Sequence, residues 1–270
     1  MKNFSTILLA TVTSLILVSC TQNSITGRKQ LALISDTELS NMAKQEYQTF
    51  LSQNKVVSAS ASKDAEMVRR IGRRLTAAIT KYYSEKGLSQ ELQGYEWEYN
   101  LVDSKEANAW CMPGGKIVVY TGLLPITQNE AALAVVMGHE IAHALAKHGN
   151  ERMSQTMVAQ GIGVVGGALT AGDAQVSNIF NNVYGPAAQV GVLLPNSRKQ
   201  ELEADRYGLI FSALAGYNPQ EAIPLWQRME KASGSSKPPE FLSTHPAEST
   251  RIQKLQQLMP EALKYYKPMN

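Results

Sequence analysis

The sequence predicts an α+β fold that is mainly α-helical, with a small β-sheet beside its central helix. Three observations lead to it: apolar stripes at helical spacing, two short strand-like segments at residues 96–102 and 117–120, and an apolar helix directly after them. The 270-residue chain is 44% apolar and 18% charged, which is enough for one sizeable core. We therefore expect residues 35–270 to form a single domain.

Residues 1–19 predict a signal peptide that is not part of the fold. Lys2 provides a positive charge, residues 7–18 form a short apolar run, and Cys20 follows the run. This pattern is typical of a bacterial lipoprotein, whose lipidated Cys20 would anchor the chain in a membrane of the cell envelope. An ordinary secretion signal with a chance cysteine is the alternative. Because Thr21 rather than an aspartate follows Cys20, we expect the outer membrane, facing the periplasm.

Residues 20–34, in which Thr, Gln, Asn, Ser and Gly are frequent, predict a tether between this anchor and the domain. Cys111 is the one cysteine besides Cys20, so the domain has no internal disulfide and must rely on its core and a metal. The formal net charge is +3 and the basic residues form only short pairs, so nothing indicates a nucleic-acid partner.

Two helices are predicted before the strands. Ser35 followed by Glu38 fits a capping box that opens a helix to about residue 51. Residues 64–83 form the second helix, whose apolar stripe consists of Val68, Ile71, Leu75 and Ile79. Ahead of the second strand, Pro113-Gly114-Gly115 predicts a turn between extended segments.

The central helix, predicted to start with a capping box from Thr127 to Glu130, carries the sequence His139-Glu140-Ile141-Ala142-His143. On a helix, His139 and His143 lie one turn apart on the same face, where two imidazoles can bind one zinc ion. Glu140 is then placed to activate a water molecule. A surface helix with solvated histidines is the alternative. The apolar neighbours favour a buried helix, whose ionisable groups need a partner such as a metal.

A catalytic zinc needs a third protein ligand, and His148 is the nearest candidate in sequence. On a continuous helix, however, His148 would lie on the face opposite His139. The longer metzincin pattern fails as well, because Ala146 and Gly149 stand where it needs glycine and histidine. We expect Gly149 to end the helix and His148 to be a polar residue of its last turn.

A better ligand lies about sixty residues further on, in a predicted helix with small and apolar residues that indicate close packing. Glu201 and Asp205 share one face of this helix. Glu201 can bind the metal, and Asp205 can accept a hydrogen bond from a ligand histidine. An exposed charged helix is the alternative, and Glu203 is the second choice of ligand.

His245, the last histidine, precedes Pro246, which suits the first turn of a helix. His245 can reach the active site, either to stabilise the oxyanion or to cap the metal in a resting state. A local hydrogen bond at the helix start is the alternative.

Together these motifs resemble the zinc metallopeptidases grouped with the CAAX prenyl protease and the heat-shock protease HtpX, and most of all their bacterial lipoprotein branch. The matching segments are Gly138-His139-Glu140-Ile141-Ala142-His143, the E-x-x-x-D run from Glu201 to Asp205, Thr244-His245-Pro246 and residues 108–124. Two departures are visible. Cys111-Met112 is bulkier than expected, and the transmembrane helices of HtpX are missing, which argues against substrates embedded in the bilayer.

The resemblance implies a zincin-like metalloprotease domain with one zinc ion per chain. His139, His143 and Glu201 would be the ligands, Glu140 the general base and Asp205 a hydrogen-bond partner of the ligands. The implied activity is cleavage of peptide bonds within chains, and the expected role is quality control of misfolded envelope proteins. A zinc-bearing chaperone or assembly factor that holds such proteins without cutting them is the alternative, as is a structural lipoprotein with a chance motif.

The second strand suggests how a substrate binds. We expect Gly115, Lys116, Ile117, Val118 and Val119 to form an exposed edge strand that pairs with an extended peptide. An interior strand that only builds the core is the alternative.

Residues 154–172 carry no charge and are rich in glycine, and we interpret them as a mobile segment or plug near the cleft. A membrane span is the alternative, but the glycines and glutamines weaken it. The tail predicts a helix opened by Asn218-Pro219, a linker over residues 233–239 and a last helix over residues 246–258.

Overall fold

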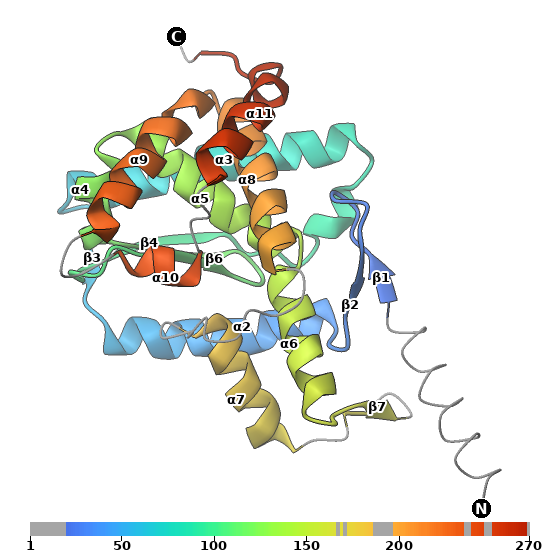
Figure 1. The fold of residues 1–270 in the computed structure, drawn as a ribbon. Helices are drawn as coiled ribbons and strands as arrows, with labels where there is room; N and C mark the ends of the chain where they lie inside the picture. The colour runs from blue at the N-terminus through green and yellow to red at the C-terminus, as the bar shows by residue number, and fades with distance from the viewer. Residues whose placement is uncertain are drawn as a thin grey trace, which may run out of the picture.

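A four-stranded sheet lies between two groups of helices (Figure 1). This computed structural model describes residues 20–165, 168–169, 172–185, 197–234, 239–245 and 250–268. The predicted signal peptide therefore lies outside the described residues. The strands are β1 (Cys20–Gln22), β2 (Lys29–Leu31), β3 (Val56–Val57), β4 (Glu98–Val102), β5 (Ala109–Met112), β6 (Lys116–Tyr120), β7 (Val164–Val165) and β8 (Ala168–Leu169).

Helices form most of the described chain, which confirms the predicted α+β class with its small sheet. The α-helices are α2 (Asp36–Gln53), α3 (Lys63–Glu85), α4 (Leu124–Thr127), α5 (Glu130–Leu145), α6 (His148–Ala159), α7 (Asp173–Tyr184), α8 (Ser197–Leu214), α9 (Ala222–Ser233), α10 (Glu240–Thr244) and α11 (Arg251–Leu263). Short 3-10 turns cover Ser89–Leu92, Thr121–Leu123 and Pro219–Glu221.

Strand β6 is the centre of the hydrophobic core. Its side chains alternate between two clusters: Ile117 and Val119 pack in the cluster formed with α3, α5 and α8, while Val118 and Tyr120 pack in the cluster formed with α2 and α7. All four are at most 3% exposed. Helices thus cover the strand on both faces, with α2 and α7 on one side and α3, α5 and α8 on the other (Figure 1).

The strand order β3-β4-β6-β5 shows that the edge-strand prediction for residues 115–119 is wrong. Strand β6 pairs with β4 in parallel and with β5 in antiparallel orientation, so its backbone groups are already used. The interior-strand alternative therefore holds. The predicted turn at Pro113-Gly114-Gly115 does connect extended segments, and the strand on its other side, β5, is an edge of the sheet.

The helix starts follow local capping rules with one correction. Ser35 caps α2 by accepting a hydrogen bond from the Glu38 N–H, as predicted. The start of α5 was misplaced, because Asn129 rather than Thr127 is its cap and accepts from the Ala132 N–H. Thr127 instead ends the short helix α4.

Helices α5 and α8 cross at two glycines. A methyl group added at Gly138 would lie 2.9 Å from the Gly208 carbonyl oxygen. One added at Gly208 would lie 2.8 Å from the backbone nitrogen of His139. The absence of side chains at both positions lets the backbones touch, as the small residues of the predicted helix indicated. This crossing brings the predicted ligands of the two helices together.

Residues 20–34 are not a tether. Strands β1 and β2 form an antiparallel hairpin, and the residues between and after them are bonded to the domain. The Asn23 side chain donates to the Leu145 carbonyl at 3.1 Å, the Tyr207 hydroxyl donates to the Ile25 carbonyl, and the Leu33 N–H donates to Ser154 Oγ at 2.9 Å. The polar composition misled because Asn23 bonds to the end of α5, and because side chains of α6 and α8 bond to backbone groups of this segment.

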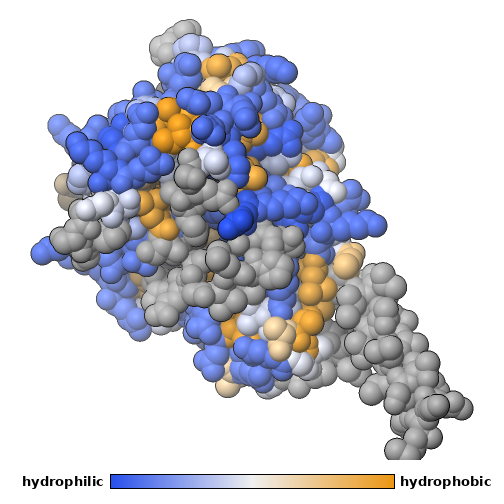
Figure 2. Space-filling model, viewed as in Figure 1, coloured by the Kyte–Doolittle hydropathy of each residue, from blue (hydrophilic) through white to orange (hydrophobic). Residues whose placement is uncertain are grey.

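No helix in the described part of the chain is long and apolar enough to cross a membrane. The visible face is mainly hydrophilic, with hydrophobic residues in separate patches (Figure 2).

Of the predicted mobile segment, residues 154–159 belong to α6, whereas residues 166–167 and 170–171 lie outside the described part. Asn218 caps the turn before α9 as expected, and Pro246 lies outside the described residues.

Candidate metal centre

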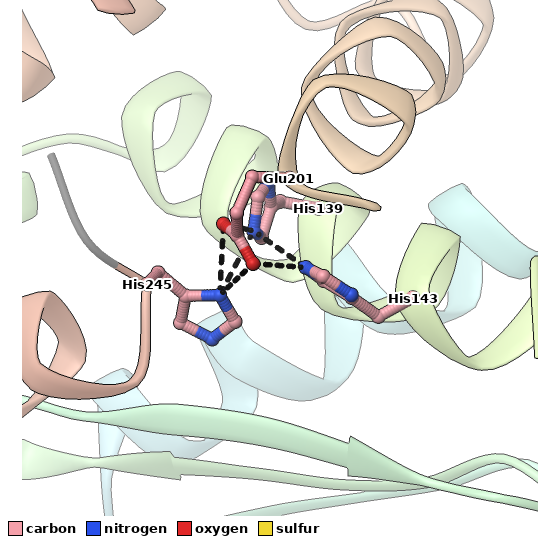
Figure 3. A group of neighbouring side chains, drawn as sticks. All are labelled: His139, His143, Glu201 and His245. Carbon is pink, nitrogen blue, oxygen red and sulfur yellow. Dashed lines mark hydrogen bonds and ion pairs between the residues drawn. The ribbon is translucent and has the colours of Figure 1, made fainter. Parts of the chain in front are cut away.

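Four side chains from three parts of the chain converge above the sheet (Figure 3). His139 and His143 come from α5, Glu201 from α8, and His245 from the residue that follows α10. The Nε2 atoms of His139 and His143 are 3.1 Å apart, and the Glu201 carboxylate lies 3.4 Å from the first and 3.3 Å from the second. His245 Nδ1 lies 3.3 Å from His139 Nε2 and 3.1 Å from the Glu201 carboxylate. The structure thus brings together the three predicted ligands and His245.

These distances fit a zinc ion. Tetrahedral zinc with bonds of about 2.0–2.1 Å to nitrogen and oxygen places its ligand atoms roughly 3.3–3.4 Å apart. The separations of 3.1–3.4 Å between pairs of these donor atoms match that spacing. Two imidazoles and a carboxylate are also a donor set that suits a catalytic zinc. The spacing of the donor atoms is therefore compatible with a bound zinc ion.

Electrostatics also favour a cation. Burial would lower the pKa of His139, but hydrogen bonds to Asp205 and Glu201 outweigh it and raise the pKa to about 9. Burial would likewise raise the pKa of Glu201, but His245 and His143 beside it hold that pKa well below its ordinary range. The site therefore holds carboxylate charge that a bound ion would balance.

Glu140 lies at the edge of the metal centre, beside His245. Its Oε1 atom is buried, has no hydrogen-bond partner among the described residues, and is 3.3 Å from His245 Nε2. Burial raises the pKa of this carboxyl, which strengthens it as a proton acceptor. An unsatisfied buried oxygen at this position suits a group that binds a water molecule.

Asp205 lies where the sequence placed it, with Oδ1 3.1 Å from His139 Nδ1. Its other neighbour, Arg251, was not predicted. Arg251 donates two hydrogen bonds to Asp205, at 3.0 and 2.7 Å, and its guanidinium lies 3.7 Å from the ring centroid of Trp226. Arg251 thus fixes Asp205, which in turn orients His139. No local pattern in α11 marks this residue.

The position of His148 differs from the predicted one. Helix α5 ends at Leu145, and Lys147 adopts a left-handed conformation (φ 56°) that turns the chain before His148 begins α6. Gly149 does not end the helix but lies within α6. Because the helix is interrupted, His148 is fully buried behind the metal site, with Nδ1 2.9 Å from His143 Nδ1.

Glu203, the second choice of ligand, points away from the four donor atoms. Its carboxylate lies 3.0 Å from His148 Nε2 and accepts from Arg28 Nε at 2.9 Å. Burial would raise the pKa of Glu203, but these two partners outweigh it and lower the pKa. Glu203 therefore stays charged, and its carboxylate contacts His148 rather than the metal site.

A cleft leads to the site between β5 and α6. Its lining combines the site residues Glu140, His143 and His245 with the edge strand Ala109–Met112 and with Arg152 and Tyr184. Arg152 was not singled out by the sequence. An extended peptide in this cleft would pass beside Glu140.

This helix pair with two histidines, a distant glutamate and an adjacent general base defines a zincin-like metallopeptidase. The sequence profile of Peptidase family M48 matches residues 65–259, and the chain belongs to this family. The predicted family resemblance is confirmed at that level.

Several relatives are named metalloendopeptidases. The chain is 38% identical to the mitochondrial metalloendopeptidase OMA1 of Schizosaccharomyces pombe over 168 residues, which cover 62% of this chain and 48% of that protein. It is 31% identical to the bovine mitochondrial metalloendopeptidase OMA1 over 257 residues, covering 91% and 47%. It is 31% identical to the β-barrel assembly-enhancing protease of Escherichia coli over 168 residues, covering 58% and 33%.

The predicted enzyme class, a zinc metalloendopeptidase, and its zinc cofactor are therefore confirmed. The chain spans about half the length of the two OMA1 proteins and about a third of the length of the Escherichia coli protease. Mitochondrial and bacterial proteins both match, so the assignment to a bacterial lipoprotein branch stays a prediction.

Proposed function

We propose that this chain is a lipid-anchored endopeptidase of the bacterial cell envelope, in which His139, His143 and Glu201 hold the zinc ion. The observation that carries the proposal is the group of four donor atoms within 4.8 Å of one another, with the unsatisfied Glu140 oxygen beside it. Zinc, when bound, supplies the Lewis acidity that makes a water molecule acidic and polarises the scissile carbonyl.

Glu140 performs the proton transfer. Its carboxylate accepts a proton from the attacking water and delivers it to the amide nitrogen that leaves. The raised pKa of Glu140 suits both steps, because the proton is held long enough to be passed on. Asp205, fixed by Arg251, keeps the His139 ring in place throughout.

His245 occupies the fourth position around the site. Its Nδ1 is as close to the Glu201 carboxylate, at 3.1 Å, as the other donor atoms are to one another. This geometry favours the capping role over the oxyanion role, since a catalytic zinc needs an open position. A substrate then has to displace His245.

Strand β5 is the better candidate for binding the peptide. The Tyr120 N–H donates to the Asn108 carbonyl, so alternate residues 108, 110 and 112 face β6. The backbone groups of Ala109 and Cys111 therefore point out from the edge. The same edge already accepts one bond, from the Phe241 N–H to the Ala107 carbonyl. A substrate strand that pairs with the edge at Ala109 and Cys111 lies next to Glu140.

The location and substrates rest on the N-terminal motif. Cys20 is exposed at the start of β1, so it is free to carry lipid chains. Such an anchor places the cleft at a membrane of the envelope, where misfolded envelope proteins are the expected substrates. One relative is named a β-barrel assembly-enhancing protease, which fits a role in envelope quality control.

A chaperone or assembly factor that holds proteins without cutting them remains the second candidate, because a relative's name refers to assembly. The variant Glu140→Gln separates the two. It should retain zinc and lose about 10²–10⁴-fold in peptide hydrolysis, the usual contribution of a general base. Full rescue of cellular function by this variant would instead support the holding role.

The decisive measurement combines zinc content with proteolysis. Purified full-length protein and its Glu140→Gln and Glu201→Ala variants are compared by elemental analysis and by hydrolysis of an unfolded protein substrate. We expect zinc in the first two only and hydrolysis in the wild type only. Zinc retention and turnover in Glu201→Ala would refute the proposal. Mass spectrometry of envelope peptides released by wild type but not Glu140→Gln cells then identifies substrates.

A further inference from the structure

A continuous chain of bonded side chains leads from the metal site to the N-terminal hairpin. His143 Nδ1 is 2.9 Å from His148 Nδ1, and His148 Nε2 is 3.0 Å from the Glu203 carboxylate. Glu203 accepts from Arg28 Nε at 2.9 Å. Arg28 lies in the turn between β1 and β2, far from His143 in sequence. The chain of contacts therefore connects the N-terminal segment to a metal ligand.

The direction of these hydrogen bonds follows from the chemistry of the rings. If His143 uses Nε2 for the metal, its Nδ1 carries the hydrogen and donates to His148 Nδ1. His148 must then carry its hydrogen on Nε2, which donates to Glu203. Each ring nitrogen in the path is thus either a donor or an acceptor, and the Glu203 carboxylate at its end fixes the tautomers of both rings.

Arg28 is built to hold that carboxylate. Its guanidinium uses Nε for Glu203 and both terminal nitrogens for Glu151, at 2.6 and 2.7 Å. The Arg28 side chain is 9% exposed and that of Glu151 is 2% exposed, so the group is fixed inside the protein. Gln200 also donates to Glu151 at 2.6 Å. Arg28 thus joins α6 and α8 while it places Glu203 against His148.

We propose that Arg28 is a positioning residue of the metal centre, which acts through Glu203 and His148 on the orientation of His143. This inference rests on the proposed function, because it takes His143 as a zinc ligand. It assigns the segment directly after Cys20 to the active-site structure rather than to a linker. Partners of this kind usually change metal affinity about 10–100-fold when they are altered.

The test uses conservative variants of the full-length chain. Arg28→Lys keeps the charge but cannot hold two carboxylates with one planar fork. His148→Gln keeps a group for Glu203 and loses the contact with His143. The matched control is Arg206→Lys, because Arg206 makes a similar two-bond contact with Glu261 on the outer side of α8. Zinc affinity by chelator competition, the visible spectrum of the cobalt-substituted protein and the stability of the zinc-free protein are measured for each.

We expect Arg28→Lys and His148→Gln each to weaken zinc binding about 10–100-fold and to alter the cobalt spectrum, with Arg206→Lys close to wild type. The double variant should bind zinc no more weakly than His148→Gln alone, because both changes interrupt one path. Unchanged affinity in either single variant, or additive losses in the double variant, overturns the inference. If Arg28→Lys does not fold, His148→Gln decides alone.

A further variant, His143→Ala, separates this inference from the proposed function. Loss of zinc binding in His143→Ala together with unchanged zinc affinity in Arg28→Lys refutes the role of Arg28 only. Zinc retained at full affinity in His143→Ala refutes the proposed ligand set itself.

Discussion

Gly138 on α5 and Gly208 on α8 are in direct backbone contact, one residue before His139 and seven residues after Glu201. The contact sets the distance between the two helices that supply the metal ligands. Because the donor atoms of Glu201 and the two histidines must meet within a few tenths of an ångström, the spacing of these helices controls the metal site.

Gly208→Ala should separate α5 and α8. The added methyl group meets backbone atoms of His139 at 2.8 and 2.9 Å, which cannot give way as a flexible side chain could. We expect a loss of about 1–3 kcal/mol in the free energy of unfolding, together with weaker zinc binding. Urea denaturation and chelator competition measure the two effects. In the control Gly234→Ala, where the methyl group would lie 3.7 Å from its neighbour, both should stay near wild type.

Proline substitutions test the substrate role of β5. Cys111→Pro removes an N–H that points out from the sheet, whereas Trp110→Pro removes one that pairs with β6. We expect Cys111→Pro to lower kcat/KM for peptides about 10-fold, the loss of roughly one hydrogen bond, with zinc content and stability largely kept. Cys111→Ala controls for the side chain. Equal losses in Cys111→Ala and Cys111→Pro would argue against pairing at this edge.

His245→Ala tests the capping role. Removing the His245 imidazole opens the fourth position, while His139, His143 and Glu201 remain to hold the ion. We expect zinc to be retained, and hydrolysis of a short unstructured peptide to rise. If His245 instead stabilises the oxyanion, turnover falls about 10²–10³-fold, as when a single oxyanion donor is lost. Steady-state kinetics on one peptide distinguish the two outcomes.

The Cys111 thiol should be unreactive at neutral pH. Burial raises its pKa well above the ordinary value, and the negative charge of Glu140 adds to the effect. Since the thiolate is the reactive form, alkylation at pH 8 should be at least ~10-fold slower than for a free cysteine and should rise with pH beyond 9. The rate is measured in a Cys20→Ser background, and urea should restore it. Rapid alkylation at pH 7 would indicate an activated thiol and reopen a catalytic role for Cys111.

Local sequence was sufficient for the parts of the site that lie on regular helices. The spacing of His139 and His143 and that of Glu201 and Asp205 place each pair on one helix face. The small and apolar residues of the helix that carries Glu201 indicated that it packs closely on another helix. Arg251 could not be found in this way. It meets Asp205 from another helix, and such a contact leaves no periodic pattern.

Two errors have specific physical causes. The apolar run of β6 has no polar alternation, which is typical of a strand covered on both faces and should have argued against an edge. The position of His148 could not be predicted, because the chain turns at Lys147 with a left-handed conformation that is uncommon outside glycine. A continuous helix through Lys147 would place His148 on the face opposite His139, away from the metal site.

The packed hairpin has a consequence for how far the enzyme can reach. Asn23 is already bonded to α5, so a lipid on Cys20 would be separated from the folded body by three residues, roughly 10 Å of extended chain. A protease anchored by such a lipid would act only in a thin layer at the bilayer surface. Its encounters with substrates would then depend on lateral diffusion in two dimensions.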